Sequence, residues 1–237
     1  MQAKYKRVLV KLSGEALSGK ENGVLDFEML DRVAEAVKKC RELGVEVAIL
    51  VGGGNIWRGA KGIGMDRSRA DHMGMLATVI NALGIEDALL RAGVKAVVMS
   101  AIEMTEFAQV FVRDKADKYL SEGTVVVLGG GIGNPFFTTD TAAVIRAAEL
   151  SVDVAILAKN IDAVYDRDPR KFPDAKPFRT VDYDYIIDNK LGVIDLAAAT
   201  LSGENNLPLM LCALENPDNI VRAVCGDEIG TVVTHTK

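Results

Sequence analysis

The stretch VKLSGEALSGKE, residues 10–21, contains the residue types that bind phosphate. From Gly14 it reads G-E-A-L-S-G-K-E, one position short of the phosphate-loop pattern G-x-x-x-x-G-K-[ST]. That pattern needs a Ser or Thr for magnesium, where this chain has Glu21, and it needs a helix that begins at the Gly-Lys pair. Asn22 and Gly23 form a turn signal instead. The sequence therefore disfavours a phosphate loop at Lys20.

Lys11 is the other candidate cation of this stretch. It lies between Val10 and Leu12 in the apolar run 8–12, which predicts a buried strand. A buried ammonium group is costly unless it reaches an anion, and Ser13-Gly14 would allow a phosphate close to the backbone. Alternatively, the strand lies at a sheet edge and Lys11 extends to the surface. The strand alone leaves both interpretations open.

Two further strands are predicted to end in glycine. AILVGGGN (48–55) and VVVLGGGIGN (125–134) each end an apolar run in three glycines and then reach an asparagine. In an open parallel sheet, ligands gather at the carboxyl ends of strands, so these two ends and that of 8–12 are candidate walls of one site. Both lack the third glycine of G-x-G-x-x-G, and Pro135 interrupts the second. A Rossmann dinucleotide site is therefore disfavoured.

Apolar runs and helical periodicity alternate along the chain. Asp26 is a typical N-cap before an apolar stripe that begins at Leu30, and Gly44 is a typical helix end. The sequence predicts strands at 8–12, 45–51, 95–100, 124–131, 153–158, 207–212 and 230–234. It predicts helices at 26–44, 72–91, 113–122, 138–150, 184–189, 195–201 and from 217, with a loop at 165–180. This alternation indicates an α/β fold with a mostly parallel sheet, helices on both faces, and one domain over residues 1–237.

Composition narrows the class of protein. The formal net charge of −5 argues against nucleic acid as the main partner, although local cations can still bind a small phosphorylated ligand. Cys40, Cys212 and Cys225 form no C-x-x-C pair and the chain has two histidines, so we expect no structural zinc site. The N-terminus lacks the apolar stretch of a signal peptide, and no run approaches a membrane span. We expect a soluble cytoplasmic protein with reduced thiols.

Four stretches together resemble one known family: VKLSGEAL (10–17), GGGNIWRG (52–59), DHMGMLAT (71–78) and GNPFFTTDTAA (133–143). They look like bacterial UMP kinases, a branch of the amino acid kinase superfamily. The likeness continues through KNIDAVYDRDP and LGVIDLAAAT, and so covers nearly the whole chain. GNPFFTTD and DHMGM are specific to the uridylate branch, whereas the lysine and the glycine triplet are shared with kinases of acetylglutamate, aspartate and carbamate.

The resemblance implies a fold and a reaction. The fold is a three-layer α/β/α sandwich around a central, mainly parallel sheet, and the assembly is a homohexamer. The reaction transfers the γ-phosphoryl group of ATP to UMP, giving ADP and UDP in pyrimidine nucleotide biosynthesis. It requires Mg²⁺ with ATP and no organic cofactor. Activation by GTP and inhibition by UTP are further properties that the family implies.

The resemblance also implies a role for individual residues. Lys11 and Arg58 would neutralise phosphate charge, and Asp140 would orient these cations, so these three are the expected catalytic residues. The ATP-binding residues implied are Lys11, Leu12, Ser13, Gly14, Gly54, Arg58, Lys159, Asn160, Tyr165 and Asp168. The UMP-binding residues implied are Gly53, Asp71, Ile132, Gly133, Asn134, Pro135, Phe136, Phe137, Thr138 and Thr139, with Asp71 on the ribose hydroxyls.

Taken singly, several of these residues have plainer interpretations. Asp140 is also placed to cap the helix that follows it, Arg58 to be a surface arginine, and Asp71 to be a charge at a helix start. We interpret Trp57 as a packing residue. For Asp140 both interpretations can hold together, although capping alone would not explain the whole TTD setting. The order in which the motifs occur favours the functional interpretation of Arg58 and Asp71.

The chain departs from the family pattern in three places. Ile132 stands where a threonine is frequent, so it offers only its backbone to UMP. Lys159 stands where threonine or a small residue is frequent, and it either binds phosphate or faces solvent. The segment that would respond to GTP has an unusual composition, which puts GTP activation in doubt; it consists of Gly19, Lys20, Glu21, Asn22, Gly23 and Val24.

Two other functions remain as alternatives. A carboxylate or carbamate kinase shares the fold, but DHMGM and GNPFFTTD argue against it. A nucleotide-binding regulatory or storage protein without catalysis also shares the fold, but the presence of Lys11, Arg58 and Asp140 argues against it.

Overall fold

The computed structural model describes residues 2–18, 23–58 and 64–236. The strands are β1 (Arg7–Leu12), β2 (Glu46–Val51), β3 (Ala96–Ser100), β4 (Gln109–Val110), β5 (Val125–Gly129), β6 (Val154–Lys159), β7 (Thr180–Val181), β8 (Leu209–Ala213) and β9 (Thr231–Val233). The helices are α1 (Phe27–Glu42), α2 (Arg67–Arg91), α3 (Arg113–Ser121), α4 (Thr139–Glu149), α5 (Tyr183–Asp188), α6 (Leu196–Glu204) and α7 (Asp218–Cys225), with a 3₁₀ turn, η1, at Gly14–Leu17.

One nine-stranded sheet runs through the molecule in the order β4-β3-β5-β2-β1-β6-β8-β9-β7. All neighbouring strands pair in parallel except β8 and β9. The three strands predicted to carry the site, β5, β2 and β1, are adjacent, so their carboxyl ends meet at one edge. The predicted α/β class with a mainly parallel sheet is confirmed.

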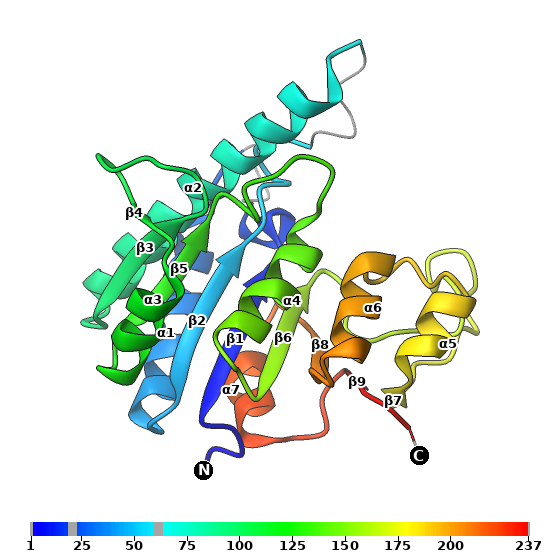
Figure 1. Cartoon of the computed structure of the whole chain (residues 1–237). Helices are drawn as coiled ribbons and strands as arrows, with labels where there is room; N and C mark the ends of the chain where they lie inside the picture. The colour runs from blue at the N-terminus through cyan, green and yellow to red at the C-terminus, as the bar shows by residue number, and fades with distance from the viewer. Residues whose placement is uncertain (1, 19–22, 59–63, 237) are drawn as a thin grey trace.

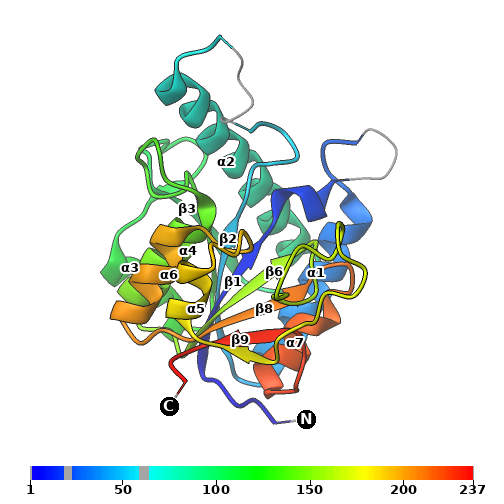
Figure 2. The ribbon, with the colours of Figure 1, turned by 90° about the vertical axis from the view of Figure 1, so that its right-hand side faces the viewer.

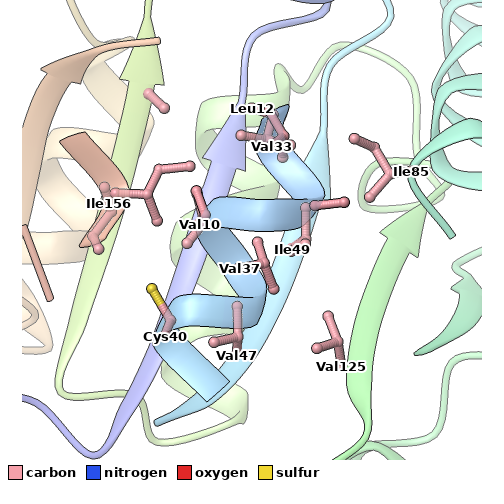
Figure 3. Close-up of a cluster of buried hydrophobic side chains, with 14 of the residues drawn as sticks. Val10, Leu12, Val33, Val37, Cys40, Val47, Ile49, Ile85, Val125 and Ile156 are labelled. Atoms are coloured by element: carbon pink, nitrogen blue, oxygen red, sulfur yellow. The ribbon is translucent and has the colours of Figure 1, made fainter. Parts of the chain in front are cut away.

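Helices cover both faces of this sheet (Figures 1 and 2). On one face α1, α2 and α7 bury a core that includes Val33, Ile85 and Ile220. Figure 3 shows part of this core, where Val37 of α1 lies over Val47 and Ile49 of β2. On the other face α3, α4, α5 and α6 pack around a second buried cluster. These are the three layers that the resemblance implies.

Strand parity decides the face to which Lys11 belongs. Successive side chains of a strand point to opposite faces. Val10 and Leu12 lie in the core under α1, whereas Leu9 lies in the core under α4, so Lys11 also points toward α4. Because β1 has β2 on one side and β6 on the other, Lys11 is in a central strand and is 6% exposed. The interpretation of Lys11 as a surface lysine on an edge strand is wrong.

Capping residues set the helix starts near the site. Asp26 caps α1 as predicted, accepting a hydrogen bond from the N–H of Met29. Asp66 caps α2 through the N–H of Arg69, so α2 begins five residues before the predicted start at 72 and Asp71 lies inside it. Thr138 caps α4 and accepts from the N–H of Asp140. The interpretation of Asp140 as the helix cap is therefore wrong.

The other differences from the predicted elements concern short segments. β4 and β7 were not predicted, because two-residue strands are too short to show a period. β5 ends at Gly129, two residues before the predicted end, because Gly130 and Gly131 take positive φ angles of 77° and 60°. The long segment between β6 and β7 is a loop, as predicted.

The helix α2 extends beyond the sheet (Figure 1). By length and composition alone it could cross a membrane, although the sequence predicted that no apolar run approaches a membrane span. Half of its apolar window is buried inside the protein, as in the core helix of a soluble fold.

Candidate active site

A cavity of 380 Å³ opens at the carboxyl ends of β1, β2 and β5. All four stretches that carry the family resemblance contribute to its wall. The lining residues are Lys11, Ser13, Gly14, Glu15, Gly52, Gly53, Gly54, Trp57, Arg58, Arg67, Asp71, Gly74, Met75, Thr78, Gly131, Ile132, Asn134, Phe137, Thr138 and Thr139. The predicted meeting of three glycine-rich strand ends is therefore observed.

Glycines let two loops of this wall cross at close range. A Cβ atom on Gly14 would lie 2.7 Å from both the carbonyl oxygen of Gly52 and the N–H nitrogen of Gly54. Such distances leave no room for a methyl group. Within the described part of the chain, the N–H groups of Gly53 and Gly54 donate no hydrogen bond to protein. These two donors at the cavity wall are thus available to an anion.

Two asparagines hold the crossing in place. Asn81 of α2 is fully buried and donates to the carbonyl of Gly52 at 2.6 Å. Its side chain also pairs with that of Asn55, at 2.8 Å and 3.0 Å, and Asn55 donates to the carbonyl of Val24. The asparagine that ends GGGN is therefore a support for the loop.

Three buried charges lie beside the cavity. Lys11 Nζ is 3.0 Å from Oδ1 of Asp140, and Lys159 Nζ is 2.5 Å from Oδ2 of the same carboxylate. The three side chains are 8%, 13% and 14% exposed for Lys11, Asp140 and Lys159. Burial acts to raise the pKa of Asp140, but the two ammonium groups outweigh it and the pKa is lowered. Asp140 is therefore ionised at neutral pH.

Lys159 is held at the back of this cluster. It also donates to the carbonyl oxygen of Val193, in the loop before α6. Burial lowers the pKa of Lys159, against the attraction of Asp140. The alternative that Lys159 faces solvent is wrong, since its ammonium group is bonded on two sides.

Asp195 braces the start of α4. It caps α6 through the N–H of Ala198, and its carboxylate accepts hydrogen bonds from the hydroxyls of Thr138 and Thr141. Thr138 in turn caps α4 at Asp140. The contact fixes the helix end that carries Asp140, so Asp195 determines where that carboxylate lies.

The opposite wall carries Asp71. Its Oδ2 accepts from Arg67 Nε and from the N–H of Phe136, both at 2.9 Å. Phe136 has a φ of 73°, which is unfavourable for a residue with a side chain, and the bond to Asp71 holds it there. The Cζ atom of Arg67 also lies 5.8 Å from the centre of the Phe136 ring, in a cation–π contact. Asp71 thus shapes the GNPFF turn.

Arg58 points toward the 3₁₀ turn that follows β1. It forms an ion pair with Glu15, and both side chains are nearly half exposed, 47% and 43%. A solvent-exposed pair of this kind is weak, so Arg58 can turn to an anionic ligand at small cost.

Comparison with known proteins places the chain in a family. The sequence profile of the amino acid kinase family matches residues 6–213. The chain belongs to the amino acid kinase family.

Three solved structures are similar to this amino acid kinase over nearly its whole length. The UMP kinase of Bacillus anthracis is 36% identical, with 97% of this chain and 96% of that one covered and a TM-score of 0.93.

The other two similar structures are more distant. The UMP kinase of Ureaplasma parvum is 34% identical, with 98% of this chain and 100% of that one covered and a TM-score of 0.91. The uridylate kinase of Archaeoglobus fulgidus is 26% identical, with 96% and 99% covered and a TM-score of 0.74. The resemblance drawn from the sequence motifs is confirmed by these matches.

Part of the predicted site of this amino acid kinase does not line the cavity. Leu12 is fully buried beneath it, and Asp140 and Lys159 lie behind Lys11. The remaining residues outside the lining are Gly133, Pro135, Phe136, Asn160, Tyr165 and Asp168. The last three lie at the end of β6 and in the loop after it, where Tyr165 donates to Asp162 and Asp168 accepts from the N–H of Arg170.

The predicted GTP-responsive segment falls mostly outside the described residues. Gly19, Lys20, Glu21 and Asn22 are not described, and neither is their relation to a phosphate loop. Gly23 and Val24 are exposed, and they precede α1.

The sequence reasoning missed several residues of the site. Arg67, Glu15 and Asp195 contact predicted residues through ion pairs or hydrogen bonds. Trp57 lines the cavity as well as packing, since its Nε1 donates to the carbonyl of Ala70. Asn81 could have been found, because an asparagine on the buried side of an apolar helix needs a partner.

We expect Asp140→Asn to lower the free energy of unfolding by about 3 kcal/mol at pH 7, because it leaves two buried ammonium groups without a countercharge. The pKa of Asp140 is lowered in the folded state, so its ion pairs stabilise the protein above the ordinary carboxyl pKa and are lost as the pH falls. The deficit of the variant should therefore shrink below about pH 4. Urea unfolding measured at several pH values checks this expectation.

The matched control is Asp184→Asn. Asp184 is also the second residue of its helix, α5, but it is exposed. Its replacement should change stability by less than about 1 kcal/mol. Equal losses in the two variants would contradict a special role for the buried cluster.

Proposed function

We propose that this chain is a UMP kinase, which transfers the γ-phosphoryl group of ATP to UMP and forms ADP and UDP. The observation that carries the proposal is the lining of one cavity by VKLSG, GGGNIWRG, DHMGM and GNPFFTTD. The similarity to two bacterial UMP kinases across at least 97% of the chain supports it. The reaction belongs to pyrimidine nucleotide biosynthesis.

Phosphoryl transfer asks for alignment and neutralised charge. Lys11 supplies a buried ammonium group at the cavity wall, and Arg58 supplies a guanidinium group whose partner among the described residues is Glu15, in a weak surface ion pair. The N–H groups of Gly53 and Gly54 add two donors. The UMP phosphate is itself the nucleophile, so the reaction needs no general base. ATP phosphates thus bind at Lys11, Ser13 and Gly14, beside the phosphate of UMP.

The nucleoside of UMP binds along the opposite wall. Both hydrogen bonds that Asp71 accepts from the described residues go to Oδ2, which leaves Oδ1 to accept from the ribose hydroxyls. Asn134 and Thr139 line the same wall and offer polar groups, while Phe137 covers an apolar surface. The pocket therefore offers hydrogen bonds for the sugar and apolar contact for the base.

Mg²⁺ accompanies ATP in this proposal. Among the residues that the structure describes, no cluster of three or more His, Cys, Asp or Glu side chains is placed to hold a metal ion. Mg²⁺ is commonly held by substrate phosphates together with one or two carboxylates, and Glu15 at the cavity suits this arrangement. When bound, the ion would supply charge neutralisation for the ATP phosphates.

The assembly and regulation are part of the same proposal. Exposed apolar residues recur on one side of α2, at Met73, Leu76 and Ile80, which supports association with further copies of the chain. We propose a cytoplasmic homohexamer of single-domain subunits. Inhibition by UTP and activation by GTP rest on the family resemblance alone.

A substrate panel tests the proposed function. ADP release from ATP is measured with UMP, CMP, acetylglutamate, aspartate and carbamate, each with and without GTP and UTP. We expect turnover with UMP. Turnover with a carboxylate or carbamate alone would favour the carboxylate kinase. Binding of UMP and ATP without turnover would favour the non-catalytic protein.

We expect Lys11→Ala to lower kcat at least about 100-fold, because it removes the buried cation at the transferred phosphate. The fold should survive, since Asp140 keeps its contact with Lys159. Coupled ADP-release kinetics and circular dichroism measure both effects. Lys95→Ala, at an exposed position before β3, is the control. Undiminished turnover in Lys11→Ala would remove this residue from the mechanism.

We expect Asp71→Asn to raise the KM for UMP about tenfold, because the ribose hydroxyls lose a charged acceptor. The KM for ATP should stay within about twofold of the wild-type value. Asp87→Asn is a matched control, since Asp87 also forms an i,i+4 ion pair with an arginine of α2 but lies away from the cavity. An unchanged KM for UMP would reject the assigned role.

A further inference from the structure

Lys159 contacts Asp140 but does not line the cavity. It is the last residue of β6, and its ammonium group bonds to Asp140 Oδ2 and to the carbonyl of Val193. Lys11, one strand away, reaches the other oxygen of the same carboxylate and does line the cavity. Lys159 is thus linked to the cavity-lining Lys11 through the carboxylate of Asp140.

The two oxygens of Asp140 contact different lysines. Oδ2 accepts a hydrogen bond from Lys159 at 2.5 Å. Oδ1 is buried, and Lys11 Nζ approaches it to 3.0 Å. The contact with Lys11 is therefore a close ion pair that engages at most one of the three ammonium protons of Lys11. Its other two protons can point toward a phosphate oxygen in the cavity.

The charges of the cluster also favour an interaction of Lys11 with a phosphate. Lys11, Lys159 and Asp140 together carry one net positive charge when both lysines are protonated, and the Asp195 carboxylate offsets part of it from the far side of Lys159. A net charge away from water is unfavourable until an anion compensates it. If Lys159 were neutral, Asp140 would cancel the charge of Lys11, and the cavity wall would attract phosphate less.

We propose that Lys159 is a positioning residue, which occupies Asp140 so that Lys11 keeps both its charge and its donors for the transferred phosphoryl group. This inference rests on the proposed kinase function. It replaces the expectation that Lys159 binds ATP directly. It also accounts for a long cationic side chain at a position where the family frequently has threonine or a small residue.

The test compares Lys159→Met, which removes the charge at similar length, with Lys159→Arg, which keeps it. We expect kcat to fall at least about tenfold in Lys159→Met while the KM for UMP changes by less than about twofold. Lys159→Arg should recover kcat to within about threefold of the wild-type value. Lys118→Met, on the exposed side of α3, is the matched control.

A structural role would give a different pattern. If Lys159 only stabilised the fold, the melting temperature of Lys159→Met would fall while the kcat of the folded enzyme stayed within about twofold of the wild-type value, and the inference would be overturned. A loss of kcat in Lys159→Arg as large as in Lys159→Met would overturn it too. Should Lys159→Met not fold, Lys159→Gln is measured against the same criteria.

A double-mutant cycle tests the path through Asp140. In an Asp140→Asn background, adding Lys159→Met should lower kcat by less than about twofold, because the carboxylate that Lys159 occupies is already gone. Fully additive losses would overturn the proposed path.

Wild-type protein in the same assay separates the two proposals. No wild-type turnover with UMP would reject the kinase function. The inference on Lys159 would then be judged by the rise in melting temperature that ATP with Mg²⁺ produces. That rise should be smaller in Lys159→Met than in Lys118→Met, and equal rises would overturn the inference.

Discussion

A single buried carboxylate joins two lysines that arrive from neighbouring strands, and the geometry of the site depends on this contact. Lys11 reaches Asp140 because the parity of β1 directs it to the α4 face of the sheet. A shift of β1 by one residue would turn Lys11 into the core under α1, where an unpaired charge is prohibitively costly. The ion cluster therefore requires the observed register of β1 and fixes the start of α4 beside the cavity.

Support for this cluster comes from a segment distant in the sequence. Residues 193–195 contact Lys159 through a backbone carbonyl and contact the cap of α4 through Asp195. The positive end of the α4 dipole faces the same region and adds to the potential that attracts phosphate. Strands β1 and β6, helix α4 and the loop before α6 thus together set the electrostatic potential at the wall that we propose for the donor phosphates.

Much of the fold followed from the sequence, because long apolar runs and capping residues act locally. β1, β2 and α1 were predicted within two residues, and the glycine-rich ends of β2 and β5 correctly indicated one cavity. The partners of the charged residues could not be predicted in this way. Whether Lys159 meets solvent, phosphate or Asp140 depends on contacts between residues 19 and 34 positions apart in the chain. For Arg67 and Asp195, the sequence pattern indicates only an i,i+4 pair on a helix and a helix cap, and not their contacts within the site.

The glycine crossing limits how such an enzyme can diverge. The backbones of Gly14, Gly52 and Gly54 lie so close together that alanine at Gly14 or Gly52 would force the loops apart. These glycines can therefore hardly be replaced at the wall that we propose for the phosphoryl donor, whichever acceptor the enzyme uses. The wall from Ile132 to Thr139 instead presents side chains to the cavity, among them Asn134, Phe137 and Thr139. New acceptor specificities on this scaffold would have to arise there, with the machinery for the phosphoryl donor inherited unchanged.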